Sequence, residues 1–316
     1  MNKVAKTYVG VDISKKYLDV SLYPSNESFR ENNDKEGVNN LLKKLKKYNL
    51  EIIACEASGG YENLFAKLCT KANEKIRIED PRRIRDFAKA KGIKAKTDSI
   101  DASVIASFAS TFPVEYEKQN LSGKHLELQE LVKYRDRLKK SLSSEKMRLG
   151  GPVYSFSEKY IKKHIVFLQK QIKMLNTKIE AIINSIEELK EKSILIQTMP
   201  GVGKDTAISL ISYLPELGTL GPKKVASLLG VAPFNKESGQ YRGVTKIKDG
   251  RSKPRSALYM AALSSSRHCP VFMEFYNRLV EKGKPKKKAL VAVMRRMAVV
   301  LDAMVANKTE WIDKTI

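Results

Sequence analysis

The sequence has few of the residues that build covalent or zinc-based scaffolds. Its 316 residues include one tryptophan, three histidines and three cysteines, Cys55, Cys69 and Cys269. The cysteine number is odd, and no two cysteines have the CxxC spacing of zinc and redox motifs. We therefore expect neither a disulfide framework nor a structural zinc site.

Long apolar runs are also missing. The most apolar late stretch, residues 289–306, is interrupted by Arg295, Arg296 and Asp302. A membrane-spanning helix needs about 20 predominantly apolar residues. The N-terminus has no apolar core followed by a small-residue cleavage site, as a signal peptide would. We expect a cytoplasmic protein without a membrane segment.

Negative charge is scarce. The chain has 59 Lys and Arg against 35 Asp and Glu, which gives a formal net charge of +24. Such a polycation favours a polyanionic partner, because neutralised phosphates release their condensed counterions. Nucleic acid is the leading partner, and a merely basic surface is the alternative. Since 42% of the residues are apolar, the chain can bury the cores of two or three domains.

The first 112 residues alternate between strand and helix patterns. The expected elements are strands at 7–13, 17–23 and 27–32, a helix through Val38 and Leu45, a strand at 50–54 ending near Glu56, a helix at 61–73, a strand at 75–79, and helices to about 109. This order predicts an α/β fold with a mixed sheet flanked by helices, as in the ribonuclease H-like (RuvC-like) fold. The actin and sugar-kinase fold has the same order and stays open, although no second Gly-rich phosphate loop is found.

Four acidic residues in this region are candidate catalytic and metal-ligating groups. Asp12 and Glu56 lie where adjacent strands are expected to end, and Asp98 and Asp101 would point from one face of a helix. Shared carboxylates can hold two Mg²⁺ ions about 3.5–4 Å apart for phosphoryl transfer. We expect Mg²⁺, with Mn²⁺ as a possible substitute. Helix capping by the sequence TDSID is the alternative for Asp98.

A charged helical region follows, from about 121 to 189. Its apolar residues alternate at spacings of four and three, which is typical of a coiled coil: Ile161, Ile165, Leu168, Ile172, Leu175, Ile179, Ile182, Ile186 and Leu189. A weaker seam begins at Leu128, and the glycines at 150 and 151 between the seams predict an antiparallel hairpin or a kinked helix. We expect a homo-oligomer, dimer or tetramer, through this coiled coil. A spacer that packs only on itself is the alternative.

The last region is expected to be mostly α-helical, and it contains a glycine turn. Gly201 and Gly203, in PGVG, precede Lys204 and a helix. This pattern is similar to helix-hairpin-helix modules, whose backbone N–H groups contact DNA phosphates. An ordinary helix-terminating turn explains it equally well. Later, a lysine-rich turn at 282–288 is read as a phosphate clamp or a solvated face.

Ser238 lies in a cationic segment of the last region. The neighbouring cations are Lys246, Lys248, Arg251, Lys253 and Arg255. Such a neighbourhood stabilises a serine alkoxide and the charge of a phosphoryl-transfer transition state. Ser-Gly is also an ordinary loop dipeptide, and Tyr241 and Tyr259 compete as hydroxyl nucleophiles. With Gly201, Gly203 and Lys204, four of these cations, at 246, 248, 251 and 255, are the candidate nucleic-acid contacts.

Five motifs in fixed order carry a family resemblance. They are GVDIS at 10–14, EASGGYE at 56–62, KTDSIDA at 96–102, PGVG at 200–203, and SG followed by KDG and Arg255. Together they resemble the insertion-sequence 110 family of transposases, which includes the Piv and MooV recombinases. The resemblance extends from Tyr8 to about Ala306.

The resemblance implies a mechanism and a set of partners. A RuvC-like domain at 1–112 would hold a DEDD carboxylate set at Asp12, Glu56, Asp98 and Asp101. A coiled-coil hairpin at 113–192 would bridge protomers, and a transposase domain at 193–316 would supply Ser238 as the nucleophile that forms a phosphoserine bond to DNA. The resemblance also implies a centre that can combine carboxylates and serine from different subunits, and a bridge RNA that pairs with donor and target DNA.

The sequence therefore predicts an enzyme, a Mg²⁺-dependent DNA transposase or recombinase that acts on double-stranded donor and target DNA under RNA guidance. Two alternatives stay open. One is a RuvC-like junction-resolving endonuclease that uses water, with Ser238 incidental. The other is a non-catalytic nucleic-acid-binding scaffold whose acids only cap helices and form ion pairs.

Overall fold

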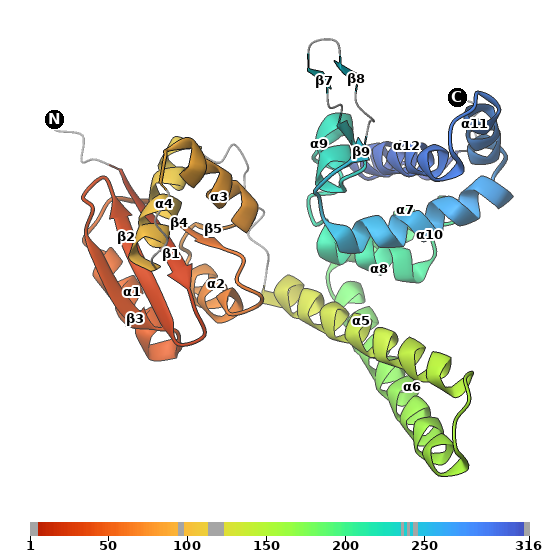
Figure 1. The fold of residues 1–316 in the computed structure, drawn as a ribbon, viewed down its shortest axis with the longest axis horizontal. Helices are drawn as coiled ribbons and strands as arrows, with labels where there is room; N and C mark the ends of the chain where they lie inside the picture. Colours follow the sequence, from red (N-terminus) through yellow and green to blue (C-terminus); the bar gives the residue numbers. More distant parts are fainter. Residues whose placement is uncertain are drawn as a thin grey trace. The chain divides into compact units, whose positions relative to one another are not determined.

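The computed structural model describes residues 6–93, 98–112, 123–234, 237–238, 241–242 and 246–312 (Figure 1). At 98–99, 237–238 and 241–242 only the backbone is described. The chain divides into two compact units, Met1–Asn120 and Leu121–Ile316. Each unit has a hydrophobic core of its own.

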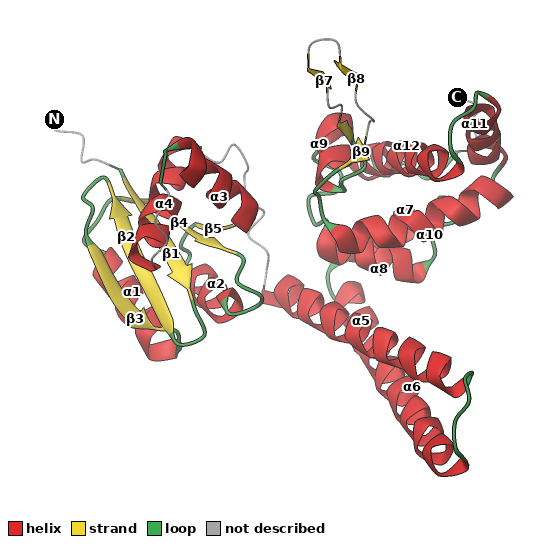
Figure 2. Cartoon of the chain, in the orientation of Figure 1, coloured by secondary structure: helices red, strands yellow, loops and turns green. Residues whose placement is uncertain are grey.

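The first unit is built on one five-stranded mixed sheet (Figure 2). Its strands are β1 (Thr7–Ile13), β2 (Tyr17–Tyr23), β3 (Ser28–Asn32), β4 (Leu50–Glu56) and β5 (Ile76–Glu79), and their spatial order is β3-β2-β1-β4-β5. The first three strands are antiparallel because short turns join them, whereas β4 and β5 run parallel to β1 after helical crossovers. The predicted mixed α/β fold is confirmed.

Helices cover both faces of this sheet. They are α1 (Lys35–Leu45), α2 (Glu62–Lys71), α3 (Pro81–Ala90) and α4 (Asp98–Thr111). Strand alternation divides the buried side chains. Val9, Val11 and Cys55 pack on the side of α1 and α2, whereas Ile52 and Ala54 pack with residues of α3 and α4. Two distinct faces are therefore defined, and the acids below belong to the second.

A helical hairpin opens the second unit. Its helices, α5 (Gly123–Leu149) and α6 (Ser155–Asn184), pack against each other, so the break at residues 150–152 makes a hairpin and not one kinked helix. Near the base, Leu128 and Ile179 join the core of the C-terminal helices. Coiled-coil geometry stays a prediction.

The heptad pattern continues beyond the helix that it predicts. The seam was expected to run to Leu189, but α6 ends at Asn184, and Leu189 belongs to α7 (Glu187–Gln197). The Ser185 hydroxyl donates to the Ile182 carbonyl at 2.9 Å, and Ile186 has an extended backbone. Both Ile182 and Leu189 are buried in the C-terminal core, so tertiary packing keeps the apolar spacing although the helix has ended.

The rest of the second unit is mainly helical. It contains α8 (Lys204–Tyr213), α9 (Gly221–Leu228), the short strands β6 (Pro233–Phe234), β7 (Glu237–Ser238), β8 (Tyr241–Arg242) and β9 (Lys246–Ile247), and then α10 (Ser252–His268), α11 (Pro270–Glu281) and α12 (Lys286–Asn307). The expected boundary between 192 and 193 falls inside α7. None of the described helices is long and apolar enough to cross a membrane.

Candidate functional site

A row of charged residues crosses the whole sheet of the first unit at one level. Asp12 is paired with Asp19 of β2, and Asp19 with Arg30 of β3. On the other side, Val11 is in register with Cys55, which makes Glu56 the next neighbour of Asp12, and Glu56 is paired with Glu79 of β5. Directly opposed residues of neighbouring strands share a face. The row therefore lies on one face.

That face is the one covered by α4. A side chain at Gly10 would overlap the backbone of Ala102 and Ala106, so α4 contacts β1 at this glycine. Asp12 is two residues farther along β1 and shares the face of Gly10. Asp101 directly precedes Ala102 in the first turns of the same helix. The fold thus places Asp12 and Glu56 on the sheet face that α4 covers, and Asp101 lies in the first turns of that helix.

The described side chains do not make a complete metal-binding set. Within the part of the chain that is described, no three His, Cys, Asp or Glu side chains come together closely enough to hold one ion. The side chain of Asp98 lies outside the described residues. Its backbone position, four residues before Ala102, is on the sheet-facing stripe of α4. Asp12, Glu56 and Asp101 are each partly exposed.

The two outer acids of the row were missed by sequence reasoning. Arg30 donates to both oxygens of Asp19, at 2.8 and 3.1 Å, and the Asp19 side chain is only 12% exposed. Glu79 accepts from Arg77 and from Arg83, the latter at 3.0 Å. Opposed like charges destabilise a sheet, and these arginines offset that cost. Only the strand register, which no motif encodes, could have revealed the row.

The predicted glycine turn lies between α7 and α8. Gly201 has a positive φ of 83°, and a side chain there would overlap Ser265 and the backbone of Ala261 in α10. Gly203 precedes α8, is exposed and has free space around it. Gly201 therefore serves close packing of helices, while Gly203 leaves the start of α8 accessible.

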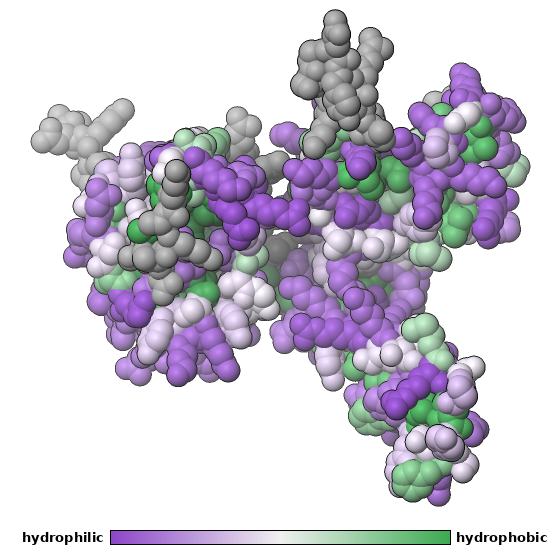
Figure 3. Space-filling model, in the orientation of Figure 1, coloured by the Kyte–Doolittle hydropathy of each residue, from purple (hydrophilic) through white to green (hydrophobic). Residues whose placement is uncertain are grey.

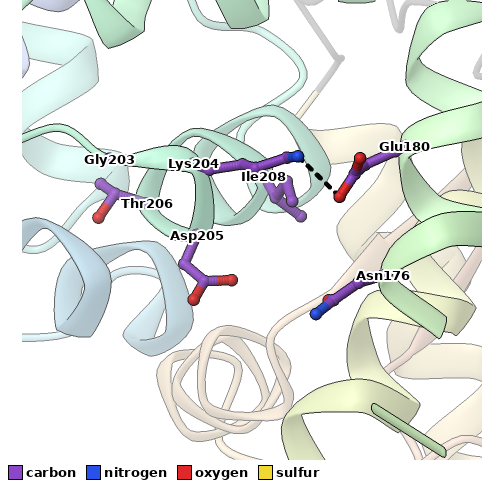
Figure 4. A pocket seen from close by; sticks show the side chains of 7 residues that line it. All are labelled: Asn176, Glu180, Gly203, Lys204, Asp205, Thr206 and Ile208. Atoms are coloured by element: carbon purple, nitrogen blue, oxygen red, sulfur yellow. Dashed lines mark ion pairs between the residues drawn. The ribbon is translucent and has the colours of Figure 1, made fainter. Parts of the chain in front are cut away.

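A pocket of about 350 Å³ opens beside this helix start (Figure 4). Lys204 faces Glu180 of α6 across the pocket at 2.8 Å. Asp205, on the same helix turn, accepts from Lys139 at 2.9 Å and from the buried Arg135 at 3.2 Å. Burial raises the pKa of Asp205, but Lys139 and Arg135 outweigh it and hold that pKa below the ordinary value. The pocket is thus an ion-pair junction between α5, α6 and α8.

Ser238 lies in a small antiparallel ribbon. β6 pairs with β9, and farther along β7 pairs with β8, where Ser238 is directly opposite Tyr241. Ser238 and Tyr241, two of the three hydroxyl residues that compete as nucleophiles, are thus backbone neighbours. Lys246 and Lys248, on the returning side, are exposed. Lys248 approaches Asp249 at 3.6 Å.

The base of this ribbon is closed by two glycines. Gly230 and Gly250 have positive φ angles of 64° and 77°. A side chain on Gly250 would overlap the backbone of Gly230, and one on Gly230 would overlap Asp249 and Arg255. Arg255 donates to the carbonyls of Asp249 and, at 3.4 Å, Gly230. The KDG motif and Arg255 therefore build the closure.

Arg251 anchors the same closure to the helices below it. Its guanidinium donates to both oxygens of Glu216, at 2.6 and 2.7 Å, and to the Tyr213 carbonyl at 2.9 Å. Burial raises the pKa of Glu216, but the hydrogen bonds and charge of Arg251 prevail and lower it. Arg251 and Arg255, expected to contact nucleic acid, thus have structural contacts in the protein. Their contact with nucleic acid stays a prediction.

Comparison with known protein families decides the assignment. One family model, a DEDD transposase of the IS110 type described as "Transposase", matches residues 9–152. A second, described as "Transposase IS116/IS110/IS902 family", matches residues 193–277. This chain belongs to the IS110 family of transposases. The first match includes the sheet and its acids, and the second includes the ribbon of Ser238.

Relatives of this IS110-family transposase include two proteins that align with it over nearly the whole of both chains. The pilin gene-inverting proteins of Moraxella lacunata and Moraxella bovis are each 28% identical over 324 aligned positions, which cover 99% of both chains. An uncharacterized IS110 insertion-element protein of Streptomyces coelicolor is 31% identical over 134 residues, 42% of this chain and 33% of that protein. The family assignment makes this protein a transposase or recombinase with DNA substrates.

DEDD transposases generally depend on divalent metal ions. On the sheet face covered by α4, the acids supply carboxylate oxygens, which are hard ligands of the kind that Mg²⁺ and Mn²⁺ accept. The donor chemistry of Asp12, Glu56 and Asp101 therefore fits such an ion.

Proposed function

We propose that this IS110-family transposase cleaves and rejoins DNA through the hydroxyl of Ser238, assisted by divalent metal ions that Asp12, Glu56, Asp98 and Asp101 hold. One observation carries the metal part of the proposal. Asp12 and Glu56 are neighbours on parallel strands, on the sheet face where α4 begins with the other two acids. We assign the sheet to the ribonuclease H-like fold, because carboxylates from two central strands and a following helix converge in that fold.

The metal ion in this proposal is Mg²⁺, with Mn²⁺ as its substitute. When bound, such ions neutralise charge on the attacking and leaving oxygens of a phosphoryl transfer. The acids of the first unit would hold them, and the arginine partners of Asp19 and Glu79 keep the outer carboxylates in place at each end of the row. Asp12 and Glu56 lie between these outer carboxylates, on the inner strands β1 and β4.

The nucleophilic step uses the second unit. The Ser238 oxygen bonds to a DNA phosphorus and loses its proton, while a bond from that phosphorus to a deoxyribose oxygen breaks and the released oxygen takes up a proton. Attack by another deoxyribose hydroxyl on the phosphoserine reverses these changes and joins a new strand. Energy of the phosphodiester is retained in the covalent intermediate. The glycine closure and Arg255 fix the base of the ribbon that carries this serine.

The partners in this proposal are donor and target DNA, a bridge RNA and further copies of the chain. The two Moraxella relatives are named for inversion of a pilin gene, and inversion and transposition need the same strand cleavage and joining. We propose three functional regions, 1–112, 113–192 and 193–316, with the helical hairpin as the contact between protomers. Exposed apolar surface supports such a contact, and Figure 3 shows hydrophobic patches on the helical hairpin. Phe156, Tyr160, Phe167 and Met174 on α6 are each more than half exposed.

Ser238→Ala tests the nucleophile. The variant lacks the attacking oxygen, so we expect no covalent protein–DNA adduct and no strand exchange, while thermal unfolding is unchanged. The measurement is gel electrophoresis, under denaturing conditions, of reactions that contain labelled DNA, Mg²⁺ and the bridge RNA. Tyr241→Phe is the matched control, because Tyr241 is the cross-strand neighbour of Ser238, and it should retain adducts.

Other outcomes separate the alternative functions. Adducts that persist in Ser238→Ala but vanish in Tyr241→Phe would assign the nucleophile to the tyrosine. Cleavage without any adduct would favour a junction-resolving nuclease that uses water. DNA that stays intact with wild-type protein, metal and RNA would favour a non-catalytic scaffold.

A further inference from the structure

The turn between α11 and α12 concentrates positive charge. We call Lys282, Lys284, Lys286, Lys287 and Lys288 the α11–α12 lysine cluster, and all five are exposed. Between residues 278 and 296 the chain has eight Lys and Arg and one acid, Glu281. This density is far above that of the whole chain. The cluster is therefore a distinct basic patch on the second unit.

The cluster lysines have no acidic partners within the described residues. Several lysines elsewhere do, for example Lys44 with Glu31 at 2.6 Å and Lys192 with Glu188 at 2.9 Å. No ion pair or hydrogen bond from a side chain of the cluster is present in the described part of the chain. Five close like charges repel one another, and no carboxylate of the described residues pairs with them to offset this repulsion.

The local backbone adds to the same field. Gly283, with a φ of 79°, ends α11, and the Lys284 amide donates to the Leu279 carbonyl at 3.0 Å. Pro285 precedes α12, and its first turn has no acid and no side-chain cap. The positive end of a helix dipole favours anions and disfavours cations. Lys286, Lys287 and Lys288 are placed at that end, against local stability.

The buried side of α12 shows that the turn is firmly held. Ala289, Leu290 and Val293 are buried directly after the cluster, and Leu290 and Val293 belong to the C-terminal core. Arg296 lies over the ring of Phe275 at 4.7 Å, and Arg278 lies over the same ring at 5.5 Å. The lysines therefore project from a rigid corner, and binding there requires little ordering of the backbone.

We infer that the α11–α12 lysine cluster is a docking site for the phosphodiester backbone of double-stranded DNA, separate from the ribbon of Ser238 and from the PGVG turn. Unpaired lysines that fan out over one helix turn suit phosphates, which carry no sequence information. DNA is the occupant because the family assignment gives DNA as substrate. The inference rests on that substrate class and not on the serine or metal chemistry.

The test replaces Lys286, Lys287 and Lys288 together by Gln, which keeps helix propensity. The matched control replaces Lys43, Lys67 and Lys71, exposed lysines of α1 and α2 on the opposite face of the sheet from the acids, by Gln. Both triple variants lose the same formal charge. Affinity for a 40-base-pair duplex is measured by fluorescence anisotropy across a salt series with full-length protein, and a single-stranded RNA of equal length is measured in parallel.

We expect the cluster variant to bind duplex at least tenfold more weakly at physiological salt. Its slope of log affinity against log salt should fall by about 2 to 3, because each lost phosphate contact removes nearly one counterion. The control should change both quantities much less. Equal losses in the two variants, or a loss confined to RNA, would overturn the inference. Strong duplex binding by the cluster variant would overturn it while leaving the proposed strand chemistry intact. If the wild-type protein did not bind duplex at all, the assignment of DNA as substrate, on which the inference rests, would be contradicted.

Discussion

At the residue scale, a glycine decides how the acidic row is covered. Gly10 lies two residues before Asp12 on the face that α4 contacts. A side chain there meets backbone atoms of α4, which cannot rotate away as a side chain would. In the motif GVDIS, Gly10 thus leaves room for α4 to pack on β1, and Asp12 lies on the same face of the strand. Packing of α4 on the sheet face that carries Asp12 depends on this glycine.

We predict that Gly10→Ala destabilises the first unit by about 3 kcal/mol, in the range of overpacked cores. The reason is that α4 must move off β1. Chemical unfolding followed by circular dichroism measures the loss, and strand exchange should fall with it. Gly123→Ala is the control, since a side chain at Gly123 meets nothing within 4 Å. Equal stability of the two variants would show that α4 does not pack on Gly10.

At the element scale, a buried acid joins two helices that are distant in sequence. Asp302 of α12 is 4% exposed. Its two oxygens accept the amide protons of Gly218 and Gly221, both at 2.7 Å, at the start of α9. A helix start has backbone N–H groups without partners, and here another helix supplies the acceptor. The loop and helix before the Ser238 ribbon are therefore held by α12.

Asp302→Asn should lower the stability of the second unit by about 2 to 4 kcal/mol. The asparagine side chain keeps one oxygen acceptor, but its NH₂ group faces the second of the two backbone N–H groups, those of Gly218 and Gly221. One buried donor is then left without an acceptor. Unfolding followed by tryptophan fluorescence measures this loss. Glu274→Gln, an exposed change in α11, should leave the midpoint unchanged, and a similar loss in both variants would contradict the role given to Asp302.

At the scale of the whole molecule, the two units are supported by separate hydrophobic cores. The single tryptophan, Trp311, stacks on Phe272 at 5.2 Å in the second unit. Its fluorescence therefore reports only that unit, whereas circular dichroism reports both. None of the described core residues belongs to clusters of both units.

For Gly10→Ala we accordingly expect the circular dichroism transition to broaden toward lower denaturant while the Trp311 fluorescence transition stays in place. Independent unfolding of two cores is the physical reason. A parallel shift of both signals would mean that the units unfold as one cooperative structure.

The sequence by itself determined the local elements and the family. Periodicity gave the strand and helix order of the first unit, because side-chain alternation is a local property of the backbone, and ordered motifs indicated a transposase. The heptad spacing failed at Asn184, since burial in a shared core can preserve apolar spacing after a helix ends. Here a continuous helix and a broken helix packed in one core produce the same spacing of apolar residues.

Only the tertiary structure decided which distant residues meet. The alignment of Arg30, Asp19, Asp12, Glu56 and Glu79 in one row follows from strand register. The structural contacts of Arg251 with Glu216 and of Arg255 with the glycine closure follow from packing of helices far apart in the chain. Charge and motif position say that such residues can contact phosphates, but pairing depends on distances in space, which a one-dimensional pattern does not contain.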